Sequence, residues 1–192
     1  MRKIICISLF CALLTTSCKK DVEVCNKYTE LTDRNHLVDI SALNAAPEIL
    51  DSLAKYPQLQ VYKIINDQHT IGVHCHVFYQ GLKVFTDNYR LFKSKNDNHV
   101  YNLEDIIPTA INISLAPSIQ FEEAIGLARQ NVNFTDQCIS YRLGIYDINA
   151  ATSFQPTDYR LTWRIQGENK FPVVVLDAHT GQVYYKDDGF RE

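Results

Sequence analysis

The sequence lacks the concentration of positive charge that marks a protein of nucleic-acid metabolism. Its 19 lysines and arginines are scattered along 192 residues and are outnumbered by 22 acidic residues, which gives a formal net charge of -3. A surface that binds phosphate backbones gathers its basic residues into a stripe or patch. Glycine-rich phosphate loops, nucleophile elbows and calcium-binding loops are also absent. We therefore expect no nucleic-acid partner and none of the reactions that depend on these motifs.

The apolar run at the N-terminus is too short to cross a bilayer as a helix. It extends from Ile4 to Leu14, whereas a spanning helix needs roughly 20 residues. Arg2 and Lys3 precede the run, and three small polar residues separate it from Cys18. This order predicts a secretory leader over residues 1–17, whose removal takes away two positive charges and changes the net charge from -3 to -5. A retained transmembrane segment is the alternative.

Hydrophobic and aromatic residues are plentiful in the chain. Hydrophobic residues make up 46% of it and charged residues 21%, and there are 11 tyrosines and 9 phenylalanines. This composition is typical of a folded protein and favours strands over disorder. A body of roughly 150 residues buries about 70% of the surface of its unfolded chain, so it can hold a hydrophobic core without further support.

The end of the predicted leader, from Leu13 to Cys18, resembles a bacterial lipobox. The resemblance implies that the Cys18 thiol receives a diacylglycerol, which supplies the two acyl chains that stable membrane attachment needs. The following Lys19, Lys20 and Asp21 resemble the export signal of some surface lipoproteins of Gram-negative bacteria. We expect a lipid-anchored protein in the cell envelope of such a bacterium, at the outer membrane on its periplasmic face or at the cell surface. An ordinary cleavable leader, with Cys18 present by chance, is the alternative.

Residues 18–40 predict a flexible tether, because they carry scattered charge and no sustained apolar period. About twenty flexible residues have a reach of roughly 25 Å, which holds the folded part clear of the lipid headgroups. The folded part divides at a seam of small residues around Pro117, into residues 41–112 and 113–192. The expected fold class is α+β, with two small lobes that each pack a helix on an antiparallel sheet.

Residues 41–112 predict one helix followed by a meander of strands. The helix covers Pro47–Ala54, where apolar residues recur at helical spacing after a proline suited to the first turn. Gly81 supplies the positive φ that a tight hairpin requires. The strands expected here are Leu59–Asp67, Thr70–Tyr79, Leu82–Lys93 and Val100–Leu103.

Residues 113–192 predict one helix laid on a second sheet. Glu122 and Glu123 favour the first turn of the helix through its dipole, and an apolar stripe follows them. Trp163 alternates with apolar residues and is expected in the core rather than in a ligand platform. Asp177 is expected to accept backbone N–H bonds across a turn that ends at Gly181. The strands expected here are Ile139–Ile145, Tyr159–Ile165, Phe171–Asp177 and Gln182–Lys186.

Two sets of motifs resemble the propeptides of thermolysin-type peptidases. The segment Val77–Phe85 resembles the Tyr-Gln-Gly-x-x-Val-Phe hairpin of the fungalysin/thermolysin propeptide motif. The second half resembles a PepSY domain, and the residues that carry this likeness are Glu122–Ala128, Leu161–Ile165 and Asp177–Val183. The motifs stand in the order found in those propeptides and together cover most of residues 45–188. The resemblance implies a cystatin-like arrangement in each half.

The peptidase domain that follows such propeptides carries a His-Glu-x-x-His helix, which holds a zinc ion, and this sequence contains no such string. The resemblance therefore implies a protein that is not an enzyme and has no cofactor. It implies a membrane-anchored, propeptide-like lipoprotein that binds a secreted thermolysin-type metallopeptidase and restrains it or assists its folding. The alternative is a structural or ligand-binding envelope lipoprotein that reuses the same scaffold, because fold does not fix function.

His74 and His76 are the residues that invite a metal-site hypothesis. They flank Cys75 in a predicted strand, which places both imidazoles on one face and the thiol on the other. A metal site would need a distant third ligand such as His99, and exposed strand histidines are the commoner outcome, so no metal is expected. His179 sits in the turn from Asp177 to Gly181 and is expected to face solvent. A catalytic histidine would need an orienting partner, and none can be named.

Three cysteines remain once the leader is removed and Cys18 carries lipid, namely Cys25, Cys75 and Cys138. In an oxidising compartment they can form a disulfide. Cys75 alternates with apolar residues and is expected to be buried, whereas Cys138 begins a strand in the other half. Separate buried thiols are the expectation, and a bridge between Cys75 and Cys138 is the alternative.

Overall fold

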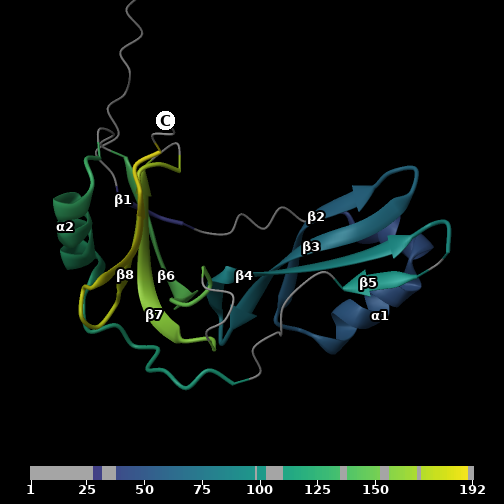
Figure 1. Ribbon diagram of the computed structural model, residues 1–192, viewed down its shortest axis with the longest axis horizontal. Coiled ribbons are helices and arrows are strands. Elements are labelled where there is room, and N and C mark those ends of the chain that lie inside the picture. The colour runs from purple at the N-terminus through teal and green to yellow at the C-terminus, as the bar shows by residue number, and fades with distance from the viewer. Residues whose placement is uncertain are drawn as a thin grey trace, which may run out of the picture.

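The chain has an α+β fold in which few helices pack on one large sheet (Figure 1). In this computed structural model the described part of the chain contributes nine strands to that sheet. No helix within the same part is long and apolar enough to cross a bilayer. The predicted leader, Cys18 and the tether up to residue 27 lie outside the described residues, which are 28–31, 38–97, 99–102, 110–134, 138–151, 156–167 and 170–189.

The first half begins with a short 3-10 helix, η1 (Ile40–Ala45), and the helix α1 (Pro47–Lys55). Pro47 occupies the first turn of α1, where its missing N–H costs no hydrogen bond. The hairpin formed by residues 70–94 has a two-residue turn, with φ of 47° at Gln80 and 83° at Gly81. The meander is confirmed with small shifts at its ends, and its strands are β2 (Leu59–Asn66), β3 (Thr70–Tyr79), β4 (Leu82–Ser94) and β5 (Val100–Asn102).

The second half contains the expected helix, α2 (Phe121–Asn131), with its two glutamates in the first turn. Trp163 is 8% exposed and belongs to the core, as its alternation predicts. The last hairpin starts two residues later than expected, after a cis peptide bond between Phe171 and Pro172. The strands are β6 (Ile139–Asp147), β7 (Tyr159–Gly167), β8 (Val173–Asp177) and β9 (Val183–Asp187).

The strands of both halves form a single sheet, in the order β2-β3-β4-β6-β7-β8-β9, with β5 beside β4. The halves join where β4 pairs in parallel with β6, which sets Lys83 opposite Gly144 and Val84 opposite Ile145. The other neighbours along this order pair antiparallel. Two lobes with separate sheets are therefore not confirmed. A parallel pairing between distant segments leaves no local signal in the sequence.

The helices α1 and α2 stand at opposite ends of this sheet (Figure 1). Strand register and the buried clusters place both of them on the same face. A first hydrophobic cluster lies between α1 and β3, and a second lies between α2 and β7. Ile145 belongs to the first cluster, and Leu143 on the same side of β6 packs against the second. Ile113 and Leu115 touch both clusters, so the predicted seam between the halves is packed over a shared core.

A strand also forms inside the segment that the sequence predicts to be a tether. β1 (Tyr28–Glu30) pairs in parallel with β6, and the Leu31 N–H donates to the Tyr141 carbonyl oxygen at 2.7 Å. The tether prediction for residues 18–40 is therefore wrong at residues 28–31, and η1 already begins at its last residue. A short strand pairs through backbone N–H and C=O groups, which every sequence carries, so composition does not reveal such a strand.

The turn between β8 and β9 is built around Asp177, as the sequence predicts. Its Oδ1 accepts hydrogen bonds from the N–H groups of His179 and Thr180, both at 2.8 Å, and its Oδ2 accepts one from the Tyr184 hydroxyl at 2.8 Å. Gly181 closes the turn with a φ of 76°. Burial raises the pKa of the Asp177 carboxyl, but the hydrogen bonds together outweigh burial and hold the pKa below its usual value.

Replacing Asp177 by alanine is expected to destabilise the protein by about 2–4 kcal/mol, because two backbone N–H groups and a hydroxyl lose their acceptor. A lowered folded-state pKa means that the carboxylate stabilises the fold fully above its ordinary pKa of 3.8, and that this contribution disappears as pH falls through the folded-state value. Urea unfolding of wild type and variant checks both points. The gap in unfolding free energy should shrink from about pH 7 to about pH 2, and a gap that stays constant would contradict the assignment.

Candidate functional site

The side of the sheet opposite the helices is the candidate site, and we call it the uncovered face. In the described part of the chain, α1, η1 and α2 all pack on the other side. Strand register and ring contacts place its members, to which Asp177 and Asp187 at the β8–β9 end of the sheet also belong. The other members include Tyr62, Lys63, Ile65, Thr70, His74, His76, Phe78, Lys83, Phe85, Arg90, Phe92, Ser94, Tyr101, Arg142, Tyr146, Arg164 and Tyr185.

His74 and His76 lie on this face on either side of Tyr62, as the alternation along β3 predicts. The Tyr62 ring stacks on His76 with centroids 4.0 Å apart and meets His74 edge-on at 5.9 Å. The Tyr62 hydroxyl and His74 Nδ1 are 3.5 Å apart. Burial lowers the pKa of His74, and the charges of Arg90 and Lys63 lower it further. This cluster is therefore a partly apolar surface whose imidazole at His74 favours the neutral form.

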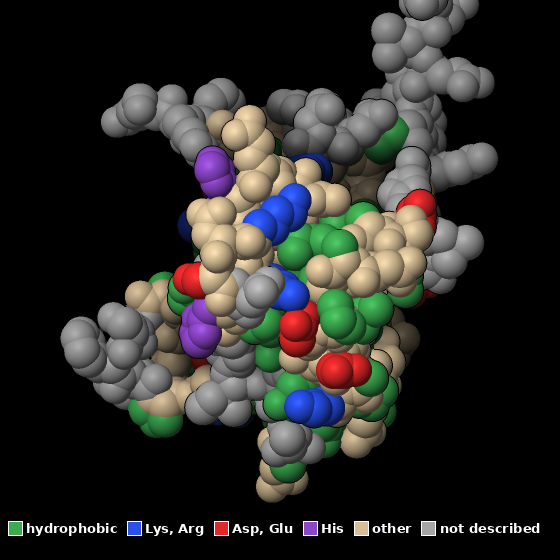
Figure 2. All heavy atoms as spheres, turned by 90° about the vertical axis from the view of Figure 1, so that its right-hand side faces the viewer, with side chains coloured by type: hydrophobic (Ala, Val, Ile, Leu, Met, Phe, Trp, Pro, Cys, Tyr) green, Lys and Arg blue, Asp and Glu red, His purple; other side chains and the backbone are tan. Residues whose placement is uncertain are grey.

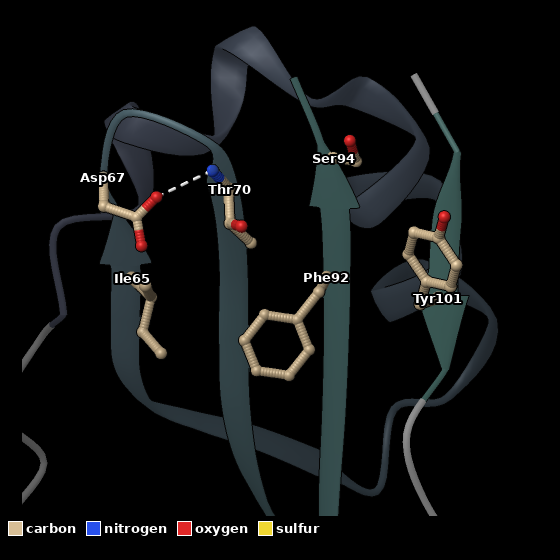
Figure 3. A pocket seen from close by; sticks show the side chains of 6 residues that line it. All are labelled: Ile65, Asp67, Thr70, Phe92, Ser94 and Tyr101. Atoms are coloured by element: carbon tan, nitrogen blue, oxygen red, sulfur yellow. Dashed lines mark hydrogen bonds between the residues drawn. The ribbon is translucent and has the colours of Figure 1, made fainter. Parts of the chain in front are cut away.

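A shallow pocket of about 370 Å³ opens at the end of the uncovered face near the β2–β3 turn (Figure 3). The Phe92 ring and Ile65 form its apolar floor, and Tyr101 stands at one side. Thr70, Ser94 and Asp67 supply polar groups at the other edge, where the Asp67 carboxylate accepts the Thr70 N–H at 2.8 Å. The pocket can receive one apolar side chain or a small planar ligand, and its size is at the low end for small-molecule sites.

The end of the sheet beyond this pocket has a different character. Figure 2 looks onto that end and shows hydrophobic side chains interspersed with basic, acidic and histidine side chains. On the uncovered face, the basic residues Lys63, Arg90, Arg142 and Arg164 lie along β2, β4, β6 and β7, and the acidic Asp177 and Asp187 lie at its β8–β9 end.

Two glycines allow phenylalanine rings to lie flat across this face. A Cβ at Gly72 would stand 2.4 Å from Phe92 Cδ1, and a Cβ at Gly144 would stand 2.4 Å from Phe85 Cζ. A side chain at either position would have to displace the ring, because real Cβ contacts are not that short. The rings therefore form a level aromatic surface rather than standing up from the sheet.

The cysteines behave differently from the expectation of separate buried thiols. Cys75 is free, fully buried and on the helix side of β3, and burial raises the pKa of its thiol to about 12. Cys138 forms a disulfide, so the prediction of a free thiol there is wrong, and its partner is not Cys75. The bridge between Cys75 and Cys138 is excluded for the same reason. Sequence spacing alone could not decide among these pairings.

His179 is half-buried rather than solvent-facing, which corrects the prediction. Its Nδ1 lies 3.0 Å from Ser118 Oγ, and its Nε2 lies 3.4 Å from the Ser114 carbonyl oxygen. The Ser118 and Ile119 N–H groups donate to the Ala178 carbonyl oxygen at 3.0 and 2.9 Å. Asp177 bonds the backbone of His179 and not its ring, so the arrangement fastens the segment before α2 to the β8–β9 turn.

Metal-ligating side chains do not converge in the described ranges, where no group of three His, Cys, Asp or Glu is placed to hold an ion. His99, named as the distant ligand for His74 and His76, lies beside Tyr101 with ring centroids 4.5 Å apart. The feature that sequence reasoning did not single out is the pair Arg142 and Arg164. The sequence did carry a signal, since each arginine alternates with core residues along its strand.

Comparisons with known proteins give a slight likeness to solved structures. No protein-family model matches the chain, and no curated protein matches it. Among solved structures, the chain is similar to the C-terminal domain of Bacillus megaterium YpeB, with a TM-score of 0.41 and 16% sequence identity over 86% of this chain and 68% of that one. A likeness of this size assigns no family and no function. The lipobox, propeptide and PepSY resemblances therefore remain predictions.

Proposed function

We propose that this protein is a non-catalytic, lipid-anchored binding module of the bacterial cell envelope, which holds a protein partner on its uncovered face. The observation that carries the proposal is the surface formed by that face, which is rich in aromatic side chains and also carries arginines. Tyr62 and Tyr101, 40% and 44% exposed, stand at one end of it, and Tyr185, 41% exposed, stands at the other. Aromatic and arginine side chains are the residues that contribute most to binding at protein interfaces.

The partner that we propose is a secreted thermolysin-type metallopeptidase, restrained or assisted in folding by this module. Support comes from the resemblance of Val77–Phe85 and of Asp177–Val183 to the propeptides of that family. Attachment through a diacylglycerol on Cys18 would keep the module, and any peptidase bound to it, at the outer membrane. The Val77–Phe85 hairpin leads directly into the uncovered face through Phe78 and Phe85.

The test uses the full chain in detergent micelles and thermolysin-type peptidases from the same organism. We expect at least one peptidase to bind and to change its rate of peptide hydrolysis. Tyr62→Ala should weaken that binding by about tenfold or more, because tyrosines are among the residues most often found as hot spots of protein interfaces. Ile40→Ala is the matched control, since Ile40 is 50% exposed but stands on η1, on the helix side. Absence of binding by every peptidase would contradict the proposal, as would equal losses in the two variants.

The pocket beside Phe92 favours a second candidate, a ligand-binding envelope lipoprotein. Its apolar floor and polar edge suit a small planar molecule. Two results together would favour this function over the first. The full chain would bind a small compound, with that binding abolished by Phe92→Ala, and it would bind no peptidase.

A further inference from the structure

The pocket at the end of the uncovered face has a floor that is held in place. The Phe92 ring lies over Gly72, where a Cβ would stand 2.4 Å from Phe92 Cδ1, and His74 meets the ring in a T-shaped contact at 5.7 Å. Ile65 on β2 and Tyr101 on β5 stand on either side of the ring (Figure 3). A planar group can therefore lie against Phe92 without a rearrangement of the floor, which removes one of the costs of binding.

The edge of this pocket carries a carboxylate oxygen that can accept a further hydrogen bond. Asp67 Oδ1 accepts the N–H groups of His69 and Thr70, both at 2.8 Å. Asp67 Oδ2 accepts no hydrogen bond from the described part of the chain, and it points along the pocket toward Ile65 (Figure 3). The two N–H bonds hold the pKa of the Asp67 carboxyl below its usual value, because they stabilise its charged form. At neutral pH the pocket therefore offers an ionised acceptor.

Charges of both signs stand around the pocket. Asp67 lies on its edge, and the Asp97 carboxylate accepts the Tyr101 hydroxyl at 3.3 Å. The Lys95 ammonium donates to the Asp67 carbonyl oxygen, and Lys63 lies on the uncovered face of β2. A charged ligand would meet both signs, and an exposed ion pair with Asp67 contributes little because water screens it. A neutral aromatic donor fits better, since its ring also covers the apolar floor.

The pocket is too shallow to enclose a free ligand. With about 370 Å³ it is at the low end for small-molecule sites, which bury most of the surface of the molecule they bind. A side chain presented by a polypeptide is instead covered from above by the rest of its own chain. The pocket is also continuous with the uncovered face, where Tyr62 meets His74 beside Phe92. It therefore suits one side chain of a partner that lies across that face.

We propose that this pocket receives a tyrosine side chain of the polypeptide partner, with the ring against Phe92 and the phenol hydroxyl donating to Asp67 Oδ2. The inference rests on the proposed function and names the residue type that the partner presents. Thr70, whose N–H binds Asp67, lies two residues from Gly72 along β3, a distance of about 7 Å. A ring over Phe92 therefore brings its hydroxyl to the edge where the carboxylate stands. Phenylalanine would fill the same space and make no hydrogen bond there.

The first part of the test is an NMR titration of the full chain in uncharged detergent. The probe is a blocked peptide with tyrosine between pairs of glycines, and the matched peptides carry phenylalanine or lysine at the centre. We expect the tyrosine peptide to bind, with the largest shifts at Asp67, Thr70 and Phe92. Each matched peptide should bind at least about tenfold more weakly, the usual effect of a hydrogen bond to a charged group. No binding of the tyrosine peptide, or equal binding of either matched peptide, would overturn the proposal.

Asp67→Asn separates recognition of the hydroxyl from a structural role. An asparagine oxygen still accepts the N–H groups of His69 and Thr70, so the turn is kept, whereas an amide NH₂ replaces Oδ2. The preference for the tyrosine peptide over the phenylalanine peptide should fall from about tenfold to none. Asp51→Asn, on α1 at the helix side, is the matched control and should keep the preference. A preference that survives Asp67→Asn would contradict the proposed hydrogen bond.

The outcome for this pocket can be told apart from the outcome for the proposed function. Binding of the tyrosine peptide that depends on Asp67, with no peptidase bound, would support the pocket and contradict the choice of partner. Peptidase binding that is unaffected by Asp67→Asn and Phe92→Ala would support the function and contradict the pocket. Tighter binding of p-cresol, a free phenol, than of the tyrosine peptide would assign the pocket to a small ligand and overturn the proposal.

Discussion

In the folded protein the Cys75 thiol should react with iodoacetamide about a thousandfold more slowly than in the unfolded chain. Only the thiolate reacts, and burial raises the pKa of this thiol from 9.0 to about 12, which lowers the thiolate fraction near pH 8 by about three powers of ten. The side chain is also fully buried beneath α1, so the reagent cannot approach it. The measurement is mass spectrometry of the Cys75 peptide after timed labelling.

The control for this experiment is the same chain labelled in urea, where Cys75 should react at the rate of an exposed thiol. Cys138 should stay unlabelled in both states until a reductant is added, because it is in a disulfide. Labelling of Cys75 at comparable rates in the folded and unfolded states would contradict the buried position of the thiol, and with it the assignment of the two faces of β3.

Replacing Trp163 by alanine is expected to cost about 3–5 kcal/mol of unfolding free energy, a typical loss for a large buried aromatic residue. The indole is 8% exposed, its Nε1 donates to the Ile119 carbonyl oxygen at 2.8 Å, and its ring meets Tyr141 edge-on at 6.0 Å. The substitution leaves a cavity in the second cluster and a carbonyl without its donor. Urea unfolding followed by circular dichroism measures the loss.

Trp163→Phe is the matched variant, because it keeps most of the apolar volume and removes the indole N–H. It should cost about 1 kcal/mol, the usual net value of one hydrogen bond. An unfolding free energy of Trp163→Ala within about 1 kcal/mol of the wild-type value would contradict the packing of β7 between α2 and the uncovered face.

The positions of the strands could be predicted from the sequence because their signal is local. Along β3, residues with odd numbers are apolar and pack under α1, while His74 and His76 take the other side. The same reasoning placed Trp163 in the core and Asp177 at a turn. A period of two decides which way each side chain points, whatever the strand pairs with.

The pairings between distant segments could not be predicted in this way. No sequence pattern in β4 or β6 predicts that Val84 lies opposite Ile145. The pairing of β1 with β6 is made by main-chain groups, so side-chain patterns do not predict it either. The helix side and the uncovered face run through both halves only because of that junction. Arg142 and Arg164 could each be assigned to a face from sequence, but their direct opposition depends on the register of β6 with β7.

Hydroxyl-radical footprinting of the full chain, with and without its bound partner, tests the uncovered face most directly. Tyr62, Tyr101 and Tyr185 are 40%, 44% and 41% exposed in the free chain and should become protected in the complex. Ile40, 50% exposed on η1, and Tyr28, 45% exposed beside Arg129 of α2, should be oxidised as before. Protection of Ile40 and Tyr28 with unchanged oxidation of the three tyrosines would show that the partner binds the helix side, and would contradict the account.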